Sequence, residues 1–426
     1  MEVGARANVL TAGCRLNQAE SDALRARLIQ LGFGLVGDVR TADFCFVNTC
    51  TVTAAADRSS IQLIRRACQP VPRPRVVVLG CLAERAPARV WSIPGVAEVW
   101  DNARKQAEIA CVCPEPRRSR AFLKVQDGCN RECGYCVVGR LRGRPVSVPT
   151  KVVCHQFEQL LARGFQEVVL TGLNLGLYQD DDGTDLAGLV RMMFVQAGRR
   201  PVRIRLGSLE PDTVSRAILD LVSDQRMAPH FHLALQSGDD GVLARMERRY
   251  DSQAFAALVA ELRRVRPDAN IGFDVIVGLP AESEVSFSRT VALIDRLAPG
   301  YLHVFSYSAR PGTPAAGMAD VPAAGERRAR ARLLRERSVR FRQEYSSRFV
   351  GTVRSAVVES CATALTDNYL RVALDPLSAT EPRRMVDMMI VLESGRLVGQ
   401  PVTGRPSHDC AGAVGYSKTN TVKEVA

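Results

Sequence analysis

The sequence predicts an α/β protein with an N-terminal parallel α/β domain, a central incomplete TIM-type (β/α)6 barrel and a small C-terminal β-barrel. Three observations support this fold class. Short apolar runs alternate with helical stretches over about the first hundred residues, six further runs alternate with helices in the middle, and the last part turns to short β-like segments. The length of 426 residues fits two or three domains.

Bulk composition excludes several classes of protein. With 46% hydrophobic and 24% charged residues the chain is typical of globular proteins, and no apolar run is long enough to span a membrane. The N-terminus shows no secretory signal, so we expect a cytoplasmic protein whose 13 cysteines serve metal or redox chemistry rather than a disulfide framework. The net charge of +12 favours a polyanionic partner.

The N-terminal domain, expected over residues 1–115, repeats one pattern three times. Each apolar run ends at a cysteine and precedes a helical stretch; the pairs are 7–13 with Cys14, 43–49 with Cys50, and 75–80 with Cys81. In a parallel sheet, ligands bind beyond the carboxyl ends of the strands, so these thiols are expected to converge. Any one of them could be an ordinary buried cysteine. Three at the same point of successive strands favour a metal site.

The other seven cysteines are not expected to be metal ligands. Cys45 lies inside a predicted strand and is expected in the core, whereas Cys111 and Cys113 fall in a linker rich in proline and arginine. The remaining four are predicted to be structural: Cys68, Cys154, Cys361 and Cys410.

A cysteine loop opens the barrel domain, which is expected over residues 116–349. Cys129, Cys133 and Cys136 have the spacing C-x3-C-x2-C, one ligand short of a closed zinc or iron–sulfur site. Three thiolates on a cubane cluster leave one iron open to bind something else. Gly134 allows the backbone to pass close to such a cluster. A zinc knuckle with a distant fourth ligand is the alternative.

Six strands separated by helices predict the barrel, whose chemistry would lie at the carboxyl ends of its strands. Cys129 follows the first strand, which places the cysteine loop at the barrel mouth. Polar or glycine-containing strings end the later strands, at 171–174, 207–211, 236–238 and 276–280; each taken singly is more typical of a loop with a helix cap. The strands are expected at 121–125, 167–171, 202–206, 230–235, 271–277 and 301–307, with helices at 186–196, 213–221, 253–265 and 285–297.

A basic helix and a β-rich region follow. Residues 327–348 hold nine arginines and two glutamates, and Leu334, Phe341, Tyr345 and Phe349 form a stripe that should face the protein while the arginines face solvent. These arginines form either a solvated face or phosphate contacts. Short strands at 352–359, 368–372 and 385–391 predict a β-barrel over 350–402, followed by a polar tail over 403–426.

Residues 122–129 together with Cys133 and Cys136 resemble the cluster loop of radical S-adenosylmethionine enzymes, and the three strand-end cysteines narrow the resemblance to the methylthiotransferases. The strings 48–53 and 232–238 are most similar to the branch that acts on threonylcarbamoyladenosine in tRNA. Residues 365–369 resemble the TRAM domain of that family, a small RNA-binding β-barrel.

The resemblance implies an enzyme that adds a 2-methylthio group to C2 of N6-threonylcarbamoyladenosine next to the anticodon, at position 37 of tRNA. It implies two 4Fe-4S clusters, one on Cys129, Cys133 and Cys136 that binds S-adenosylmethionine, and one that delivers sulfur from Cys14, Cys50 and Cys81. One electron would cleave S-adenosylmethionine to a radical that abstracts hydrogen from the base. The contacts expected for S-adenosylmethionine are Tyr135, Gly172, Asn174, Glu210, Gln236, Ile276 and Gly278.

The resemblance also implies a reductant protein of flavodoxin or ferredoxin type, a sulfur donor and no membrane. Two departures concern the substrate fit: residues 137–145 lack the proline and aromatic that relatives usually carry after the cysteine loop, and Gly207 replaces a serine. Three other functions stay open. They are methylthiolation of isopentenyladenosine in tRNA, methylthiolation of a ribosomal-protein aspartate, and a non-catalytic zinc-containing RNA-binding protein.

Overall fold

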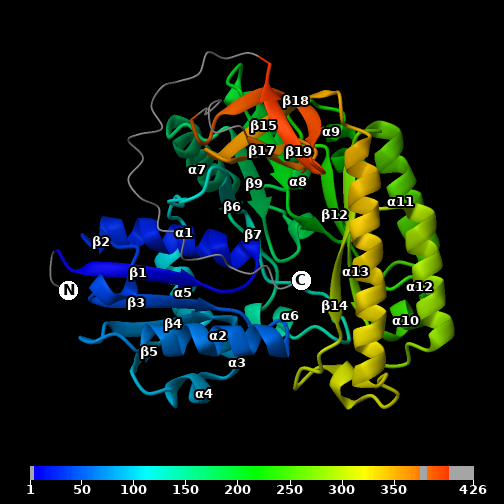
Figure 1. Cartoon of the computed structure of the whole chain (residues 1–426). Helices are drawn as coiled ribbons and strands as arrows, with labels where there is room; N and C mark the ends of the chain where they lie inside the picture. The colour runs from blue at the N-terminus through cyan, green and yellow to red at the C-terminus, as the bar shows by residue number, and fades with distance from the viewer. Residues whose placement is uncertain (1–3, 375–380, 403–426) are drawn as a thin grey trace.

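The structure, a computed structural model, describes residues 4–374 and 381–402 (Figure 1). Cys410 and the predicted polar tail over 403–426 lie outside the described residues. An N-terminal parallel sheet, a central open barrel and a small closed barrel follow one another along the chain, so the predicted α/β fold class is confirmed. In the described part of the chain, no helix is both long and apolar enough to cross a membrane.

The N-terminal sheet is parallel throughout, with strand order β2-β1-β3-β4-β5. Val77 of β4 packs under α1, whereas Val76 and Val78 pack under α2, as the two-residue period of a strand requires. The strands are β1 (Arg6–Thr11), β2 (Gly34–Leu35), β3 (Phe44–Thr49), β4 (Arg75–Gly80) and β5 (Val96–Val99). Helices α1 (Arg15–Gln30) and α5 (Asn102–Ile109) cover one face, and α2 (Ala54–Ala67), α3 (Cys81–Arg85) and α4 (Pro87–Trp91) cover the other; η1 (Val39–Thr41) precedes β3.

The central barrel consists of two parallel sheets, β6-β9-β10 and β11-β12-β13-β14, which follow directly on one another because only Gly207 separates β10 from β11. Among the described residues no ladder joins β14 to β6, so the barrel is open on one side, as predicted. The strands are β6 (Ala121–Lys124), β9 (Glu167–Thr171), β10 (Arg203–Leu206), β11 (Ser208–Leu209), β12 (His230–Gln236), β13 (Asn270–Val277) and β14 (Tyr301–Ser306). The remaining elements up to residue 317 are β7 (Gln126–Asp127), α6 (Val138–Arg142), β8 (Val146–Ser147), α7 (Thr150–Ala162), η2 (Leu175–Leu177), α8 (Leu186–Ala197), η3 (Pro211–Thr213), α9 (Arg216–Leu221), α10 (Asp240–Arg245), α11 (Ser252–Val265), α12 (Glu284–Leu297) and η4 (Pro314–Gly317).

Two local expectations for this region were wrong. The helix predicted from residue 213 begins only at Arg216, because Val214 is extended and the Ser215 side chain caps the helix by accepting from the Ile218 N–H. Cys113 is not a linker residue but is buried in the core of the central barrel. Cys45 is fully buried, as predicted.

Helix α1 packs against the inner face of the barrel. Ala19 on α1 packs against Phe122 of β6 and Val169 of β9. Their neighbours Leu123 and Val168 point the other way, into the core under the outer helices, so Phe122 and Val169 lie on the inner face of the barrel. The N-terminal region therefore packs against the inner face of the barrel.

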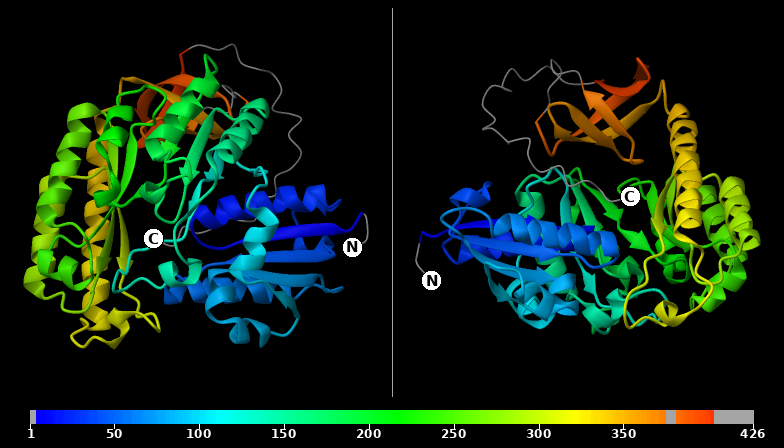
Figure 2. Two further views of the ribbon diagram at one scale, coloured as in Figure 1. Left: turned by 180° about the vertical axis from the view of Figure 1, so that it is seen from behind. Right: turned by 60° about the horizontal axis from the view of Figure 1, so that its bottom comes forward.

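Helix α13 (Ala324–Ser347) leads from the central barrel to the small barrel (Figure 2). The predicted stripe is confirmed, since Leu334, Phe341, Tyr345 and Phe349 are all buried. The expectation that the arginines face solvent is wrong for Arg330. Its guanidinium is buried and donates to Glu282 at 2.6 Å.

The C-terminal barrel is closed, in the order β15-β16-β17-β19-β18. The strand predicted over 368–372 was wrong in its bounds: only residues 371 and 372 lie in a strand, because the chain turns at Tyr369, whose φ is +69°, between two short strands. The barrel docks where the central strands begin, with Asn270 donating to the Asn368 carbonyl at 3.0 Å and Arg120 to Glu359 at 3.0 Å. Its strands are β15 (Val353–Ser360), β16 (Thr363–Thr366), β17 (Arg371–Leu374), β18 (Met385–Glu393) and β19 (Arg396–Pro401).

Candidate cysteine-bound cofactor sites

The structure brings the three strand-end cysteines together. Cys14 stands before α1, Cys50 follows β3, and Cys81 begins α3. The thiols of Cys14 and Cys81 lie near enough to Cys50 to add to the effect of burial, which raises the pKa of Cys50 to about 12. Gly13, at φ +101°, has no room for a side chain, because a Cβ there would lie 2.5 Å from the Cβ of Cys50.

Polar side chains hold the loops that carry these thiols. Asn17 donates to the carbonyls of Ala12 at 2.9 Å and Thr49 at 3.0 Å. The Ser60 hydroxyl accepts from the Cys50 N–H at 3.0 Å and donates to the Cys50 carbonyl at 2.9 Å. The backbone around the trio is thus pinned by buried hydrogen bonds from two helices.

The second cysteine trio lies on one loop at the mouth of the central barrel. The Cys129 N–H donates to the Gly143 carbonyl at 3.0 Å, and the Gly134 N–H donates to the Met246 carbonyl at 3.1 Å. Burial raises the pKa of Cys133 to about 11, and Arg248 opposes this rise by donating to the Cys133 sulfur at 3.0 Å. Burial also raises the pKa of Cys136.

The spacing of both trios fits a cluster better than a single metal ion. Four sulfurs around a tetrahedral zinc, at about 2.3 Å from it, lie about 3.8 Å apart. In the described residues, the only His, Cys, Asp or Glu trio whose ligand atoms lie within 4.8 Å of one another is His232, Asp274 and His303. Neither cysteine trio is that tight. Three thiols around a wider space suit an iron–sulfur cluster.

Four of the seven residues expected to contact S-adenosylmethionine surround the cysteine loop. The side-chain nitrogen of Asn174 lies 3.9 Å from the Cys129 sulfur, and its side-chain oxygen is buried with no hydrogen-bond partner among the residues that the structure describes. Tyr135 and Ile276 share one apolar cluster, and Arg248 links Tyr135 and Glu210.

The other three expected residues have different neighbours. A Cβ on Gly172 would lie 2.9 Å from the Gln126 side chain, and one on Gly278 would collide with Arg327. Gln236 ends β12 at a positive φ of 62° and is almost fully buried.

Two arginines beside the trios were not predicted from the sequence. Arg248 joins Cys133, Tyr135 and Glu210, yet in the sequence it is one of three arginines between 245 and 249. Arg142 stands six residues after the cysteine loop and lies near enough to Cys81 to interact electrostatically. Only its place in the string 137–145, which departs from the family pattern, singled it out.

Arg142 belongs to a buried ionic network between the two trios. Glu20 on α1 is fully buried and accepts from Arg142 at 2.7 Å and pairs with Lys105 at 2.9 Å and Lys124 at 3.2 Å. Burial alone would raise the pKa of Glu20, but these three cations hold it well below its ordinary value. Asp127, just before the cysteine loop, accepts from Lys124 at 2.6 Å. Figure 1 shows α6, which carries Arg142, between the N-terminal sheet and the barrel.

A second buried network also joins these two parts of the chain. Arg310, which follows the last barrel strand, donates to Thr51 at 2.8 Å and to Asp57 at 2.7 Å. Arg85 donates to the same two side chains, both at 2.6 Å. Thr51 is adjacent to Cys50, so this network anchors the strand-end trio to the rim of the barrel.

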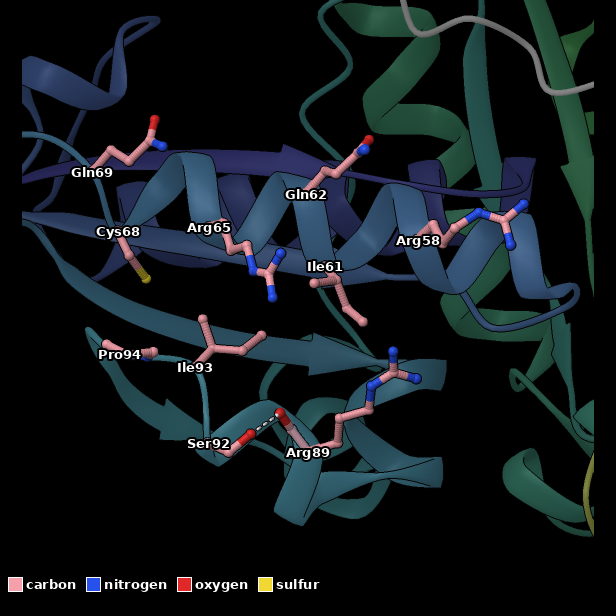
Figure 3. Close-up of a pocket in the computed structure, with 10 residues that line it drawn as sticks. All are labelled: Arg58, Ile61, Gln62, Arg65, Cys68, Gln69, Arg89, Ser92, Ile93 and Pro94. Carbon is pink, nitrogen blue, oxygen red and sulfur yellow. Dashed lines mark hydrogen bonds between the residues drawn. The ribbon is translucent and has the colours of Figure 1, made fainter.

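A separate groove of about 600 Å³ lies on the N-terminal region, between α2 and α4 (Figure 3). Its floor is apolar and includes Ile61 and Ile93. Arg65 and Arg89 point into the space between the two helices, and Arg58 lines the same groove. None of these three arginines has an acidic partner among the described residues.

The fold and the cysteine loop define a radical S-adenosylmethionine enzyme. Residues 123–294 match the model of the radical SAM superfamily, and residues 6–100 match that of the uncharacterized protein family UPF0004. The solved radical S-adenosylmethionine methyltransferase TsrM from Kitasatospora setae has the same fold, with a TM-score of 0.55 and 16% identity over 74% of this chain and 75% of that one.

Curated relatives narrow the class. The chain is 36% identical to the threonylcarbamoyladenosine tRNA methylthiotransferase MtaB of Aquifex aeolicus, over 84% of this chain and 94% of the relative. It is 31% identical to the protein of that name from Bacillus subtilis, over 85% and 88%. It is 33% identical to the tRNA-2-methylthio-N(6)-dimethylallyladenosine synthase of Methylococcus capsulatus, over 82% and 83%. The chain therefore belongs to the family of radical SAM tRNA methylthiotransferases, and its cofactors are S-adenosylmethionine and two 4Fe-4S clusters.

Proposed function

We propose that this enzyme adds a methylthio group to C2 of N6-threonylcarbamoyladenosine at position 37 of tRNA. The observation that carries the proposal is the pair of cysteine trios joined through Arg142 and Glu20, a loop trio beside a strand-end trio. The MtaB relatives, which match most of the chain at up to 36% identity, support this substrate over isopentenyladenosine or a ribosomal-protein aspartate.

In this proposal Cys129, Cys133 and Cys136 hold the cluster that binds S-adenosylmethionine, and Cys14, Cys50 and Cys81 hold the auxiliary cluster. The two cofactors supply radical hydrogen abstraction and sulfur, which protein side chains alone cannot provide. The chain itself positions them. Tyr135 and Ile276 offer an apolar wall, Asn174 and Glu210 offer polar atoms beside the loop, and α1 packs against the inner face of the barrel.

Three regions divide the work in this proposal: residues 1–115 carry the auxiliary site, 116–349 the barrel, and 350–402 an RNA-binding barrel of TRAM type. We also propose that the enzyme works in a reducing cytoplasm with a flavodoxin- or ferredoxin-type reductant and a sulfur donor.

The basic surface supports an RNA substrate. The groove with Arg58, Arg65 and Arg89 offers three guanidinium groups that have no acidic partner in the part of the chain that the structure describes, and the whole chain carries a net charge of +12. Guanidinium groups without acidic partners are suited to phosphate oxygens of an RNA backbone.

The decisive experiment is mass spectrometry of tRNA nucleosides from a strain that lacks this gene, with re-expression of the chain as the control. We expect loss of the 2-methylthio group from threonylcarbamoyladenosine and its return on re-expression. Unchanged tRNA with an altered ribosomal protein would transfer the function to a protein substrate. Loss of the group from isopentenyladenosine alone would assign the other tRNA branch.

A further inference from the structure

A polar cluster lies inside the barrel lumen, below the expected S-adenosylmethionine contacts. On β12, β13 and β14 the outward side chains, such as Leu233, Phe273 and Val304, pack into the core under the outer helices. The alternate residues must therefore face inward. They are His230, His232, Asp274, Tyr301 and His303.

These inward side chains form one connected set. His232 Nε2 lies 2.8 Å from the Asp274 carboxylate, and His303 Nδ1 lies 3.5 Å from the same oxygen. The Tyr301 hydroxyl lies 2.9 Å from His232 Nδ1 and 2.7 Å from His230 Nε2. Asp274 thus fixes the imidazole rings of His232 and His303, and the Tyr301 hydroxyl fixes those of His230 and His232.

The exposure of the side chains in this cluster increases from His232 through Asp274 to His303. The side chain of His232 is 4% exposed, that of Asp274 is 20% exposed and that of His303 is 46% exposed. Since His303 faces the lumen, its exposed surface belongs to the inside of the barrel. Its Nε2 atom has no partner among the described residues and is therefore available to a ligand.

A glycine on β13 makes space for the Tyr301 ring. A Cβ on Gly272 would lie 2.2 Å from the Tyr301 ring, so only glycine lets Tyr301 cross under the cluster. Ile276 lies two residues after Asp274 on β13 and shares an apolar cluster with Tyr135 of the cysteine loop. Two strand residues span about 6.6 Å. The polar cluster is thus one layer of side chains away from the proposed cofactor contacts.

One cation reaches this lumen without an acidic partner. Arg15, at the start of α1 and adjacent to Cys14, donates to the Tyr369 hydroxyl at 2.6 Å. It lies close enough to His230 and His232 to help lower the pKa of both rings, for which burial is the main cause. No carboxylate pairs with Arg15 in the described part of the chain.

We propose that Arg15 and His303 bind the carboxylate and hydroxyl of the side chain on N6 of the target adenosine, with Asp274 and His232 as positioning residues. The inference rests on the proposed function and names how its substrate is selected. A threonylcarbamoyl group supplies the anion that Arg15 lacks and a hydroxyl for His303. An isopentenyl group would offer neither an anion to Arg15 nor a hydroxyl to His303, and sites built to hydrogen-bond a substrate group reject apolar analogues strongly.

The test compares anticodon stem-loop RNAs that differ only on N6: the threonylcarbamoyl group, its neutral methyl ester, and an isopentenyl group. We expect the wild-type enzyme to prefer the free carboxylate over the ester by about tenfold in kcat/KM, and the Arg15→Gln variant to lose that preference. His303→Phe, which keeps a ring without nitrogen, should lower kcat/KM for both threonylcarbamoyl RNAs about tenfold. His155→Phe, an exposed histidine on α7, is the matched control and should behave as wild type.

Two readouts separate this inference from other outcomes. Formation of 5′-deoxyadenosine without RNA should be unchanged in His303→Phe, which excludes a general loss of cofactor chemistry or folding. Arg15→Gln with the wild-type preference for the carboxylate would overturn the inference. The inference would also be overturned if the enzyme contained a stoichiometric non-iron metal that His303→Phe removes. His232, Asp274 and His303 would then form a metal site. A wild-type enzyme that converts only the isopentenyl RNA would instead overturn the proposed function.

Discussion

The two cysteine trios are built in contrasting ways. The strand-end trio takes one thiol from the segment that follows each of three strands, β1, β3 and β4, and depends on the register of the N-terminal sheet. The loop trio lies within eight residues, 129–136, and depends on one turn clamped by backbone hydrogen bonds. A site whose ligands come from distant segments of a sheet is lost when the sheet is disturbed. A site whose ligands lie on one short loop tolerates substitutions elsewhere in the chain. The comparison therefore predicts separable defects.

The largest effects should come from the cysteines themselves. Cys133→Ala should abolish cleavage of S-adenosylmethionine, because it removes a ligand of the loop cluster. Cys50→Ala should leave cleavage and stop methylthiolation. Chromatography of 5′-deoxyadenosine and mass spectrometry of the RNA measure the two activities, and Cys45→Ala, a buried cysteine outside both trios, is the control. Cleavage that survives in Cys133→Ala would refute the division.

A backbone change can break the strand-end trio without touching a ligand. Gly13→Ala should lower the iron content of the auxiliary site, since the new Cβ would lie 2.5 Å from the Cβ of Cys50, while cleavage of S-adenosylmethionine persists. Gly4→Ala is a matched control, with φ +100° and no atom within 4 Å of the new Cβ. Iron and sulfide analysis after anaerobic reconstitution measures the difference. Equal iron in the two variants would contradict the steric argument.

The bridge between the trios should carry much of the stability. Glu20→Gln leaves Arg142, Lys105 and Lys124 buried with one carboxylate fewer, which should cost about 3–5 kcal/mol in the free energy of unfolding. Denaturant titration measures this loss. Glu158→Gln, which breaks the exposed pair with Arg200, should cost no more than about 1 kcal/mol. Equal losses would show that the network is not coupled to folding.

Acid should weaken the same bridge. The pKa of Glu20 and that of Asp127 are lowered in the folded chain, so their stabilising contribution is complete above the unfolded value of about 4 and is lost as the pH falls through the folded values. We expect the denaturant concentration at the unfolding midpoint to decrease as the pH is lowered below about 4. Glu20→Gln should make this midpoint depend less on pH. If stability depends on pH in the variant as it does in the wild type, Glu20 does not cause the loss of stability in acid.

The smallest effect should distinguish the two trios electrostatically. Arg248 donates to the Cys133 sulfur at 3.0 Å and touches only the loop trio. Arg248→Met should make the potential of the loop cluster more negative by about 59 mV, which corresponds to about 1.4 kcal/mol for one electron. A redox titration followed by EPR measures the shift, with the exposed Arg249→Met as the control. A shift of the auxiliary cluster instead would reverse the assignment.

The parallel strands and the cysteine spacings were predictable from local pattern. Apolar runs that end at Cys14, Cys50 and Cys81 indicated a shared sheet edge, because parallel strands bring their carboxyl ends together. The turn at Tyr369 was not predictable, since a non-glycine residue in the left-handed region carries little sequence signal. The helix start at Arg216 depended on a serine cap that competes with an earlier start.

The sequence by itself determined the fold class, the family and the six cysteines expected to hold the clusters, because spacing and periodicity are local properties of the chain. Only the tertiary structure decided which charges meet: Arg142 with Glu20, Arg248 with Cys133, and Arg15 beside the histidines of the lumen. Arginines are frequent in this chain, 57 residues being lysine or arginine, so no pattern marks the few that are buried. Burial and the choice of partner arise when distant segments pack, and those two properties give these arginines their roles.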